Sequence, residues 1–278
     1  MMFLVFLATA KKRVKATNLT LPFPDGEKPT NAFNSQMWEF RSHQYDKLGW
    51  VNAGGPMERL AEMANFQPGE TVIDVGTGSQ AILNKIAPSG TPGQIIGFDI
   101  SKDMLGTEKV PGRFLQVADA TRMPYPNDFA DLITARMVLH HMPKPALPIQ
   151  ESFRVLKPSG RLIVGEYVAS DDEVWTFERK VFDIKEPGRH LWTGSGLAKL
   201  VSAALNDEYE KLSIGYGVME QYSVKDWMGK SGLSQDIQDA VLEEYLKAPQ
   251  SIKEKMGIIY KNGDAFVDRP FAFVRAVK

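Results

Sequence analysis

The sequence predicts an α/β fold, in which a doubly wound sheet of mostly parallel strands carries helices on both faces. Short β-branched runs alternate with segments of helical periodicity from residue 56 to residue 168, which is the order expected for parallel strands joined by crossover helices. A glycine loop follows the first of these strands. The chain has 278 residues, of which 43% are hydrophobic and 24% charged, so it can bury the core that such a sheet needs.

The first elements lie on either side of the glycine loop. A helix is expected over 57–64, because apolar residues recur there at i, i+3 and i+7. The β-branched run 71–75 predicts a buried strand. A second helical face begins at Ile82. The expected order is therefore helix, strand, glycine loop and helix.

Four further strands continue the alternation as far as residue 168. They are expected over 94–99, 113–118, 129–135 and 161–168. A helix over 146–156 precedes the last of them, and the turn sequence at 157–160 ends that helix. Because crossovers between parallel strands are right-handed, the carboxyl ends of the strands border one crevice, where ligands bind in such sheets.

The domain organisation follows from these patterns. Residues 1–35 are expected to form an extension or linker, and residues 36–278 a single domain. After residue 170 helical faces alternate with two predicted strands, over 209–217 and 271–278. The segments 171–206 and 218–262 are interpreted as helical lid or insertion segments of the single domain.

Charge and cysteine content exclude several classes of protein. Lys and Arg number 33 against 34 Asp and Glu, which gives a net charge of −1, whereas a domain held to nucleic acid by phosphate attraction carries a strong basic excess. The chain has no cysteine, which excludes disulfides and thiolate metal sites. Its four histidines show no spacing typical of a metal site. Neither nucleic acid nor a metal is therefore expected as a ligand.

The first ten residues are mostly apolar and precede the basic run 11–15. Such a stretch is too short to cross about 30 Å of hydrocarbon as a helix, and a secretory signal places its positive charges before the apolar stretch. Stable membrane insertion is therefore not expected, and a cytoplasmic location is. An extension, an interfacial or partner contact and a targeting element stay open for this segment.

The glycine loop is the first candidate for chemistry. Residues 76–81 fit the pattern G-x-G-x-x-G/A, in which glycines let the backbone approach a ligand and a helix N-terminus faces negative charge. Asp99 ends the second strand, about twenty residues further on, where a carboxylate accepts hydrogen bonds from a ribose diol. These features indicate a nucleoside cofactor and leave NAD open.

Other residues distinguish between nucleoside cofactors. Asp74 lies inside the strand before the loop, where dinucleotide enzymes usually have an apolar residue. Asp119 and Ala120 end the third strand at the same edge of the sheet, where a carboxylate can accept a hydrogen bond from an exocyclic amine. The segments 139–142 (LHHM) and 154–162 (RVLKPSGRL) complete the series.

With these motifs the sequence resembles the class I S-adenosylmethionine-dependent methyltransferases, in the small-molecule branch that includes the ubiquinone/menaquinone-type enzymes. The similar segments are VIDVGTGS, GFDISKDML, VADATRMPYPNDFADLI, LHHM and RVLKPSGRLIVGEY. The resemblance implies a Rossmann-like sheet of seven strands with an antiparallel last strand, S-adenosylmethionine as cofactor, and transfer of its sulfonium methyl group by in-line displacement to an O, C or N atom of a small organic molecule.

The resemblance also implies roles for single residues. Gly76, Thr77 and Gly78 would lie against the methionine part of the cofactor, Asp74 would hold its amino group or order the loop, and Arg136 would line the methionine pocket. Asp99 would bind the ribose, Ile100 and Met104 would enclose the adenine, and Asp119 with Ala120 would contact its edge. Gln80 departs from the family, which usually has a small residue there, and it could donate a hydrogen bond to the cofactor carboxylate.

Catalytic and acceptor-binding residues are less distinct in the sequence. His140 and His141 follow the fourth strand, where an imidazole could act as general base or have a structural role. Tyr45, Trp175 and His190 are candidates for the acceptor pocket, against a core or dimer contact, and a homodimer stays open. Two rival functions are a protein that binds S-adenosylmethionine without transferring methyl, isomerase-like or regulatory, and an NAD-dependent oxidoreductase, which Asp74 and Asp119 disfavour.

Overall fold

The computed structural model describes residues 7–8, 42, 54–88, 91, 93–105, 110–229 and 232–278. Tyr45 and nearly all of the predicted extension lie outside these residues. Within the described part of the chain, every helix is too short or too polar to cross a lipid bilayer. In the same part, no three His, Asp or Glu residues come together in a way that could hold a metal ion.

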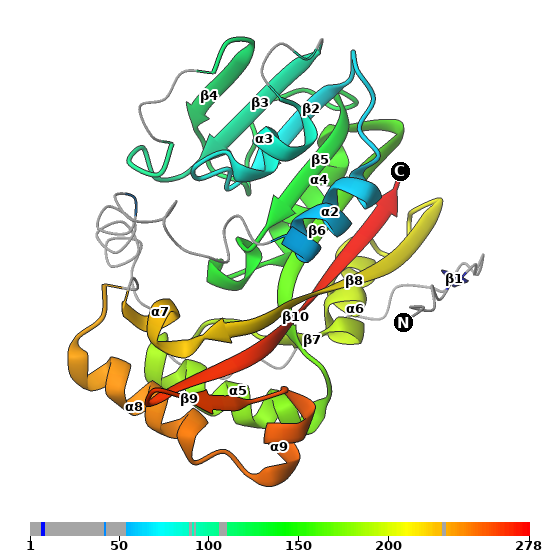
Figure 1. Ribbon diagram of the computed structural model, residues 1–278. Coiled ribbons are helices and arrows are strands. Elements are labelled where there is room, and N and C mark those ends of the chain that lie inside the picture. Colours follow the sequence, from blue (N-terminus) through cyan, green and yellow to red (C-terminus); the bar gives the residue numbers. More distant parts are fainter. Residues whose placement is uncertain are drawn as a thin grey trace.

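Seven strands form the central sheet, in the order β4-β3-β2-β5-β6-β10-β8 (Figure 1). Their bounds are β2 (Thr71–Val75), β3 (Gln94–Asp99), β4 (Arg113–Val117), β5 (Ala130–Arg136), β6 (Leu156–Ala169), β8 (Lys211–Ser223) and β10 (Asp264–Val277). β10 pairs antiparallel with both β6 and β8, whereas the pairs from β4 to β6 are parallel. The predicted fold class is therefore confirmed, with an antiparallel last strand. Three short strands are attached to this sheet: β1 (Leu7–Ala8), β7 (Trp192–Thr193) and β9 (Ile259–Lys261).

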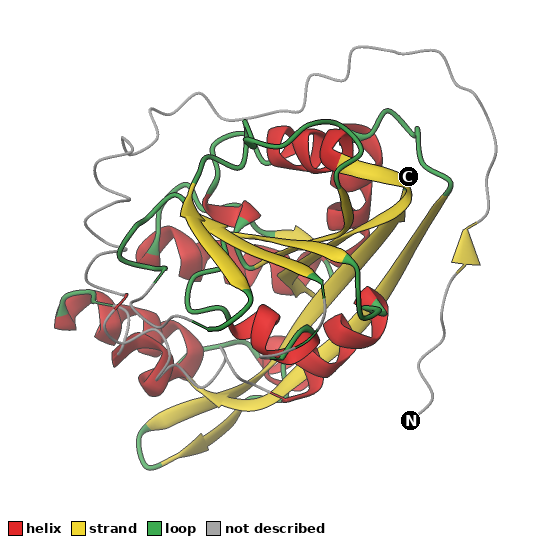
Figure 2. Cartoon of the chain, turned by 90° about the horizontal axis from the view of Figure 1, so that it is seen from above, coloured by secondary structure: helices red, strands yellow, loops and turns green. Residues whose placement is uncertain are grey.

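Helices cover both faces of the sheet (Figure 2). Val72 packs against α2 (Gly54–Ala64) and α3 (Ala81–Ile86) on one face. Its neighbour Ile73 packs in the opposite core, with α4 (Ala146–Val155) and α6 (Gly194–Ala204). Because successive side chains of a strand point to opposite faces, the unbroken apolar run of β2 serves both cores.

Two strands extend beyond the lengths that the sequence predicts. β8 continues to residue 223 and β10 begins at residue 264, and their distal halves pair only with each other and with short β9. Figure 1 shows this ribbon projecting below the sheet. The segment 218–262 is therefore not wholly helical, because the end of β8 and all of β9 belong to it.

The helices α7 (Val224–Gly229) and α8 (Gln235–Leu246) pack on the projecting ribbon, whereas α5 (Asp172–Lys185) packs on β6 and α8, and α9 (Gln250–Lys255) packs on α5. They share an apolar core of their own, which includes Val181, Val241 and Val267. The Asp171 side chain caps α5 by accepting from the backbone N–H groups of Glu173 and Val174. Lys255 of α9 forms ion pairs with Asp171 and Glu173, and these pairs hold α9 against the N-terminus of α5.

β6 begins earlier than predicted. Leu156 pairs with Ala130 before the register shifts, and Arg161 pairs with Leu132 after it. Ser159 lies between them at a φ of 64°, the left-handed conformation found in turns and bulges. The predicted turn at 157–160 is thus an irregularity within the strand.

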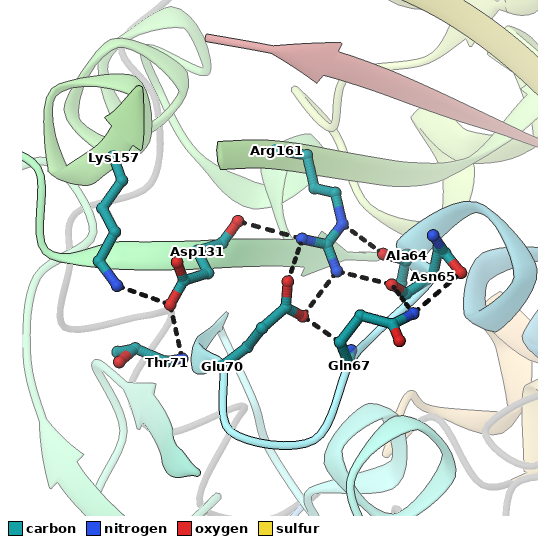
Figure 3. Close-up of polar contacts among 8 residues, drawn as sticks. All are labelled: Ala64, Asn65, Gln67, Glu70, Thr71, Asp131, Lys157 and Arg161. Atoms are coloured by element: carbon teal, nitrogen blue, oxygen red, sulfur yellow. Dashed lines mark hydrogen bonds and ion pairs between the residues drawn. The ribbon is translucent and has the colours of Figure 1, made fainter. Parts of the chain in front are cut away.

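Arg161 forms a network of hydrogen bonds at the edge of the sheet opposite the glycine loop (Figure 3). Its guanidinium donates to both carboxylate oxygens of Glu70 at 2.8 Å, and to the backbone carbonyls of Ala64 and Asn65 at the end of α2. It also donates to the carbonyl of Asp131 at 3.3 Å. The side chain is 8% exposed. One buried cation therefore joins α2, the loop before β2, β5 and β6.

Candidate functional site

A cavity of about 480 Å³ opens at the carboxyl ends of the parallel strands. Four segments line it, within 74–82, 98–104, 118–121 and 136–147. The structure brings together here ten of the eleven residues predicted to bind the cofactor: Asp74, Gly76, Thr77, Gly78, Asp99, Ile100, Met104, Asp119, Ala120 and Arg136. Gln80 is the exception.

The glycine loop is held close to the neighbouring elements. Gly76 has a φ of 64°, and a Cβ atom there would come within 2.4 Å of the Val138 side chain. The Thr77 N–H donates to the carbonyl of Phe98 at 3.0 Å, which ties the loop to β3. Glycine at residue 76 therefore meets both a conformational and a steric requirement.

Asp99 joins two loops at the centre of the cavity. One carboxylate oxygen accepts from the N–H of Gly78 at 3.2 Å, and the other accepts from the N–H of Ser101 at 2.9 Å. Burial raises the pKa of this carboxyl above its ordinary value, and the backbone hydrogen bonds lower it in part. Since a carboxylate oxygen accepts more than one hydrogen bond, Asp99 can receive ribose hydroxyls while it keeps the loops in place.

The adjoining wall is apolar. Ile100 lines the cavity with 65% of its surface exposed, and Leu147, 41% exposed, lines it as well. Met104 also lines the cavity and is buried. Asp119 is exposed and accepts from the Thr121 N–H and hydroxyl through one oxygen. An aromatic ring would cover the exposed apolar surface and present its polar edge to Asp119. The sequence did not indicate Leu147, because a single Leu on an amphipathic helix carries no chemical signal.

The opposite end of the cavity carries buried charges. Asp74 is 2% exposed and accepts from the Thr134 hydroxyl at 2.6 Å. Burial raises the pKa of Asp74 from 3.8 to about 6, although the Thr134 hydrogen bond and the charge of Arg136 lower it. Arg136 is 9% exposed. A carboxylate and a guanidinium at one end complement the ammonium and carboxylate of an amino acid, so the cavity fits S-adenosylmethionine along its length.

Asp74→Asn is expected to stabilise the ligand-free protein by up to about 3 kcal/mol at pH 7.5, since a shift of one pKa unit corresponds to about 1.4 kcal/mol. Because burial raises the pKa of Asp74, the protonated carboxyl makes its full contribution to stability below pH 3.8, and this contribution is lost as the pH rises through about 6. The gain should therefore vanish near pH 4. Denaturant titrations at both pH values measure it, and cofactor affinity should fall roughly 10- to 100-fold.

Asp131→Asn is the matched control for that prediction. Burial raises the pKa of Asp131, but the hydrogen bonds from Lys157 and the Thr71 N–H and the charges of Lys157 and Arg161 together hold it below its ordinary value. Neutralisation of Asp131 should therefore lower stability at pH 7.5 instead of raising it. Equal shifts of the same sign in the two variants would contradict the assignment of a burial penalty to Asp74.

Gln80 does not line the cavity, and its contact with the cofactor stays a prediction. Gln80 precedes α3 at a φ of 66°, and its side chain is 3% exposed. The side-chain oxygen accepts from Arg113 at 3.2 Å, and Arg113 also donates to Asn84 and to the carbonyl of Ala87. Gln80 thus adopts the left-handed conformation that favours glycine, and its side chain is directed toward edge strand β4, away from the cavity.

The two predicted histidines belong to a triad with Glu166. His140 Nδ1 lies 2.6 Å from one Glu166 carboxylate oxygen, and His140 Nε2 lies 2.8 Å from His141 Nε2. The other Glu166 oxygen accepts from the N–H groups of Val138 and Leu139 at 3.1 and 2.8 Å. Only His141 lines the cavity. Glu166, His140 and His141, called the carboxylate–histidine triad below, therefore connect a buried carboxyl to the cavity wall.

Electrostatics supports a proton-transfer role for the triad. Burial raises the pKa of Glu166 from 4.5 to about 7, and the charge of Arg189 lowers it in part. Glu166 is 1% exposed and His140 3%. A buried carboxyl that titrates near neutral pH and is hydrogen-bonded to an imidazole pair is typical of general acid–base sites.

Trp175 and His190 do not line this cavity, and their place in the acceptor pocket stays a prediction. Trp175 donates through its indole N–H to the carbonyl of Leu191 at 3.0 Å. His190 stacks on Trp192 at a centroid distance of 5.6 Å, and its backbone N–H donates to the carbonyl of His140 at 3.0 Å. They fix the segment 186–191 behind the triad. Tyr45 lies outside the described residues.

Known proteins resemble this chain over the segment that builds the site. A family model described as a methyltransferase domain matches residues 73–164. A ubiquinone/menaquinone biosynthesis C-methyltransferase from Cupriavidus pinatubonensis is 30% identical over 167 residues, which cover 56% of this chain and 67% of that protein. The family model spans the glycine loop and the carboxylates Asp74, Asp99 and Asp119.

Solved structures share the fold. A candidate methyltransferase from Bacillus halodurans has a TM-score of 0.66 at 22% identity, and the match covers 80% of this chain and 98% of that one. A phosphoethanolamine N-methyltransferase from Haemonchus contortus, crystallised with S-adenosylmethionine, has a TM-score of 0.57 at 16% identity, with 92% of this chain and 61% of that one covered. By sequence, fold and site, the chain is an enzyme that belongs to the class I S-adenosylmethionine-dependent methyltransferases.

Proposed function

We propose that this enzyme methylates a small organic molecule that carries an acidic hydroxyl group, such as a phenol or an enol, with His141 removing the hydroxyl proton. Methyl transfer then occurs at that oxygen or at a carbon atom conjugated with it. The carboxylate–histidine triad is the single observation that carries this proposal, because an acceptor that loses no proton would have no use for it. The printed name of the Cupriavidus relative, a C-methyltransferase, supports the carbon alternative.

When bound, S-adenosylmethionine supplies an electrophilic methyl group for in-line displacement. The chain's residues contribute mainly alignment, which is worth on the order of 7–11 kcal/mol for well-oriented reactants. Asp99 and the apolar wall of Ile100 and Leu147 hold the nucleoside part, and Asp74 with Arg136 holds the amino acid part. These contacts fix the position at which an acceptor can react.

The triad defines the path of the proton. With Glu166 ionised, His140 donates from Nδ1 to the carboxylate, and its Nε2 accepts from the Nε2–H of His141. His141 then takes the acceptor's proton at Nδ1. The resulting positive charge is stabilised by the buried Glu166 carboxylate through His140, as in other carboxylate–imidazole pairs.

The rival functions find less support in the structure. Gln80, the residue at which the chain departs from the family, is bonded to Arg113 and does not line the cavity, so this departure gives no support to binding without methyl transfer. An NAD enzyme would have to accommodate a phosphate-bearing cofactor next to Asp74, whose charge opposes it. We place the enzyme in the cytoplasm, in keeping with its lack of cysteine, with a small molecule as its acceptor and a homodimer left open.

Thermal shift measurements test the proposed cofactor. S-adenosylmethionine and S-adenosylhomocysteine are each expected to raise the Tm, whereas NAD and NADP leave it unchanged. Asp99→Ala should weaken binding roughly 10- to 100-fold, since it removes hydrogen bonds to a charged group worth about 1.5–3 kcal/mol. Asp103→Ala removes an exposed carboxylate of the same loop that does not line the cavity, and it should leave the shift intact.

Labelled-methyl incorporation tests the transfer itself. A metabolite extract is incubated with enzyme and methyl-labelled S-adenosylmethionine, and mass spectrometry identifies the product. A methylated hydroxyl or its conjugated carbon is the expected result. Stabilisation by the cofactor without any labelled product would favour the rival that binds without transferring, and equal stabilisation by NAD would favour the oxidoreductase.

A further inference from the structure

Gln80 closes the glycine loop at the point where α3 begins. Its backbone N–H donates to the carbonyl of Thr77 at 2.8 Å, and its own carbonyl accepts from the N–H of Asn84 at 2.8 Å. The residues on either side of it, Ser79 and Ala81, both line the cavity. The backbone conformation at residue 80 therefore determines how the loop faces the cofactor.

This conformation is unfavourable for a glutamine. Gln80 has a φ of 66° and a ψ of 21°, which lie in the left-handed region. A residue with a Cβ atom is disfavoured there, because the Cβ atom comes too close to the following carbonyl oxygen, whereas glycine is not. Such a residue keeps this conformation only where the surrounding structure holds it, so the loop needs support from a contact elsewhere in the chain.

Arg113, the first residue of β4, provides such a contact. Its Nη1 donates to the side-chain oxygen of Gln80 at 3.2 Å and to that of Asn84 at 2.6 Å, and its Nη2 donates to the carbonyl of Ala87 at 2.9 Å. One guanidinium therefore joins the residue before α3, the middle of that helix and the residue after it. Arg113 does not line the cavity, so its effect on a bound cofactor is exerted through Gln80.

We propose that Arg113 is a positioning residue for the cofactor: its hydrogen bond to Gln80 holds the glycine loop in the conformation that binds S-adenosylmethionine. A glycine at residue 80 would adopt this conformation without support, and the Arg113 contact compensates for the glutamine that this chain has instead. Because Gln80 is only 3% exposed, water does not readily replace the guanidinium. Cofactor binding, and with it this role of Arg113, does not depend on which acceptor is methylated.

Calorimetric titration of S-adenosylhomocysteine into wild type, Arg113→Met, Gln80→Gly and the double variant tests the proposal. Arg113→Met should weaken binding roughly 5- to 30-fold, because the loop then adopts the binding conformation for only part of the time. Gln80→Gly should stay within threefold of wild type, since glycine adopts the left-handed conformation without support. In the double variant, the loss of Arg113 should weaken binding less than threefold relative to Gln80→Gly.

Gln80→Ala separates the backbone conformation from a side-chain contact with the cofactor, and it leaves Arg113 in place should Arg113→Met fail to fold. Alanine keeps the Cβ atom and loses the bond to Arg113, so binding should weaken roughly 5- to 30-fold. Equal affinities of Gln80→Ala and Gln80→Gly would overturn the proposal, whether both are weakened or neither is. A shared loss would indicate that the glutamine side chain contacts the cofactor directly.

Asn84→Ala is the control, because it removes another partner of Arg113 on the exposed side of α3 and leaves the Gln80 contact in place. Its affinity should stay within threefold of wild type. Denaturant titrations of the same proteins identify a purely structural role, which would lower the free energy of unfolding without changing the affinity of the folded protein. That result would overturn the proposal, as would equal losses of affinity from Arg113→Met with glutamine and with glycine at residue 80.

Discussion

His141→Gln is expected to lower kcat by roughly 10²- to 10⁴-fold, the range that a positioned general base contributes. His141 is the one member of the triad that lines the cavity, so it receives the proton directly. Affinity for S-adenosylhomocysteine should change less than threefold, because the predicted cofactor contacts lie on other residues. The measurement is single-turnover methyl transfer to the acceptor that the labelling experiment identifies, together with calorimetry of S-adenosylhomocysteine.

Two further variants separate proton transfer from a structural role. His141→Ala should regain part of its activity when imidazole is added, because a free base can replace the missing one. Glu166→Gln should lower kcat and remove the rise of kcat with pH near 7, which the wild-type enzyme is expected to show because the ionised carboxylate is the active form. Activity of His141→Gln within threefold of wild type would exclude the proposed base.

The cofactor end of the site could be predicted because its chemistry is local in sequence. Asp74 and Asp99 each end or nearly end a strand whose apolar pattern is clear, and parallel strands bring such ends to one edge. The glycine loop between them requires left-handed backbone at Gly76 and Gly78, which restricts the choice of residue. Residue type and strand position together were therefore sufficient to place these groups around one cavity.

The acceptor end could not be predicted in the same way, because its contacts join distant parts of the chain. Glu166 lies in the apolar strand segment RLIVGEYVA, and its partner His140 is 26 residues earlier. A lone acidic residue in a buried strand is itself a signal, since such residues are rarely buried without a partner. The direction of the Gln80 side chain also depends on how loops pack, for which a single sequence gives no periodic pattern.

The length of the ribbon formed by β8 and β10 could not be predicted from the sequence either. The first half of β10, DAFVDRP, shows no regular alternation of apolar and polar residues and ends at Pro270, and a proline in a run is usually taken to end a strand. In the structure Pro270 lies within β10 and is paired with Val218 of β8. β6 pairs with β10 only from Phe271 onward. The proline thus lies where the seven-stranded sheet narrows to a ribbon, which is a tertiary property.

Arg161→Met is expected to destabilise the protein by about 3–5 kcal/mol, the cost of removing one partner from a buried ion pair, and to lower the Tm by on the order of 10 °C. Methionine retains the length of the side chain and loses every donor, so the Glu70 carboxylate and the carbonyls of Ala64 and Asn65 lose their partner. Chemical denaturation at pH 7.5 measures the loss.

Lys157→Met provides the comparison at the same edge of the sheet, because Lys157 forms an ion pair with Asp131 at 2.7 Å but is 40% exposed. A pair of this kind contributes about 0–1 kcal/mol, so a similar loss in both variants would contradict a special role for Arg161. The Tm increase caused by S-adenosylhomocysteine should persist in both proteins. Arg161 lies at the amino ends of the strands and the cavity at their carboxyl ends, so the edge that stabilises the fold is separate from the edge that binds the cofactor.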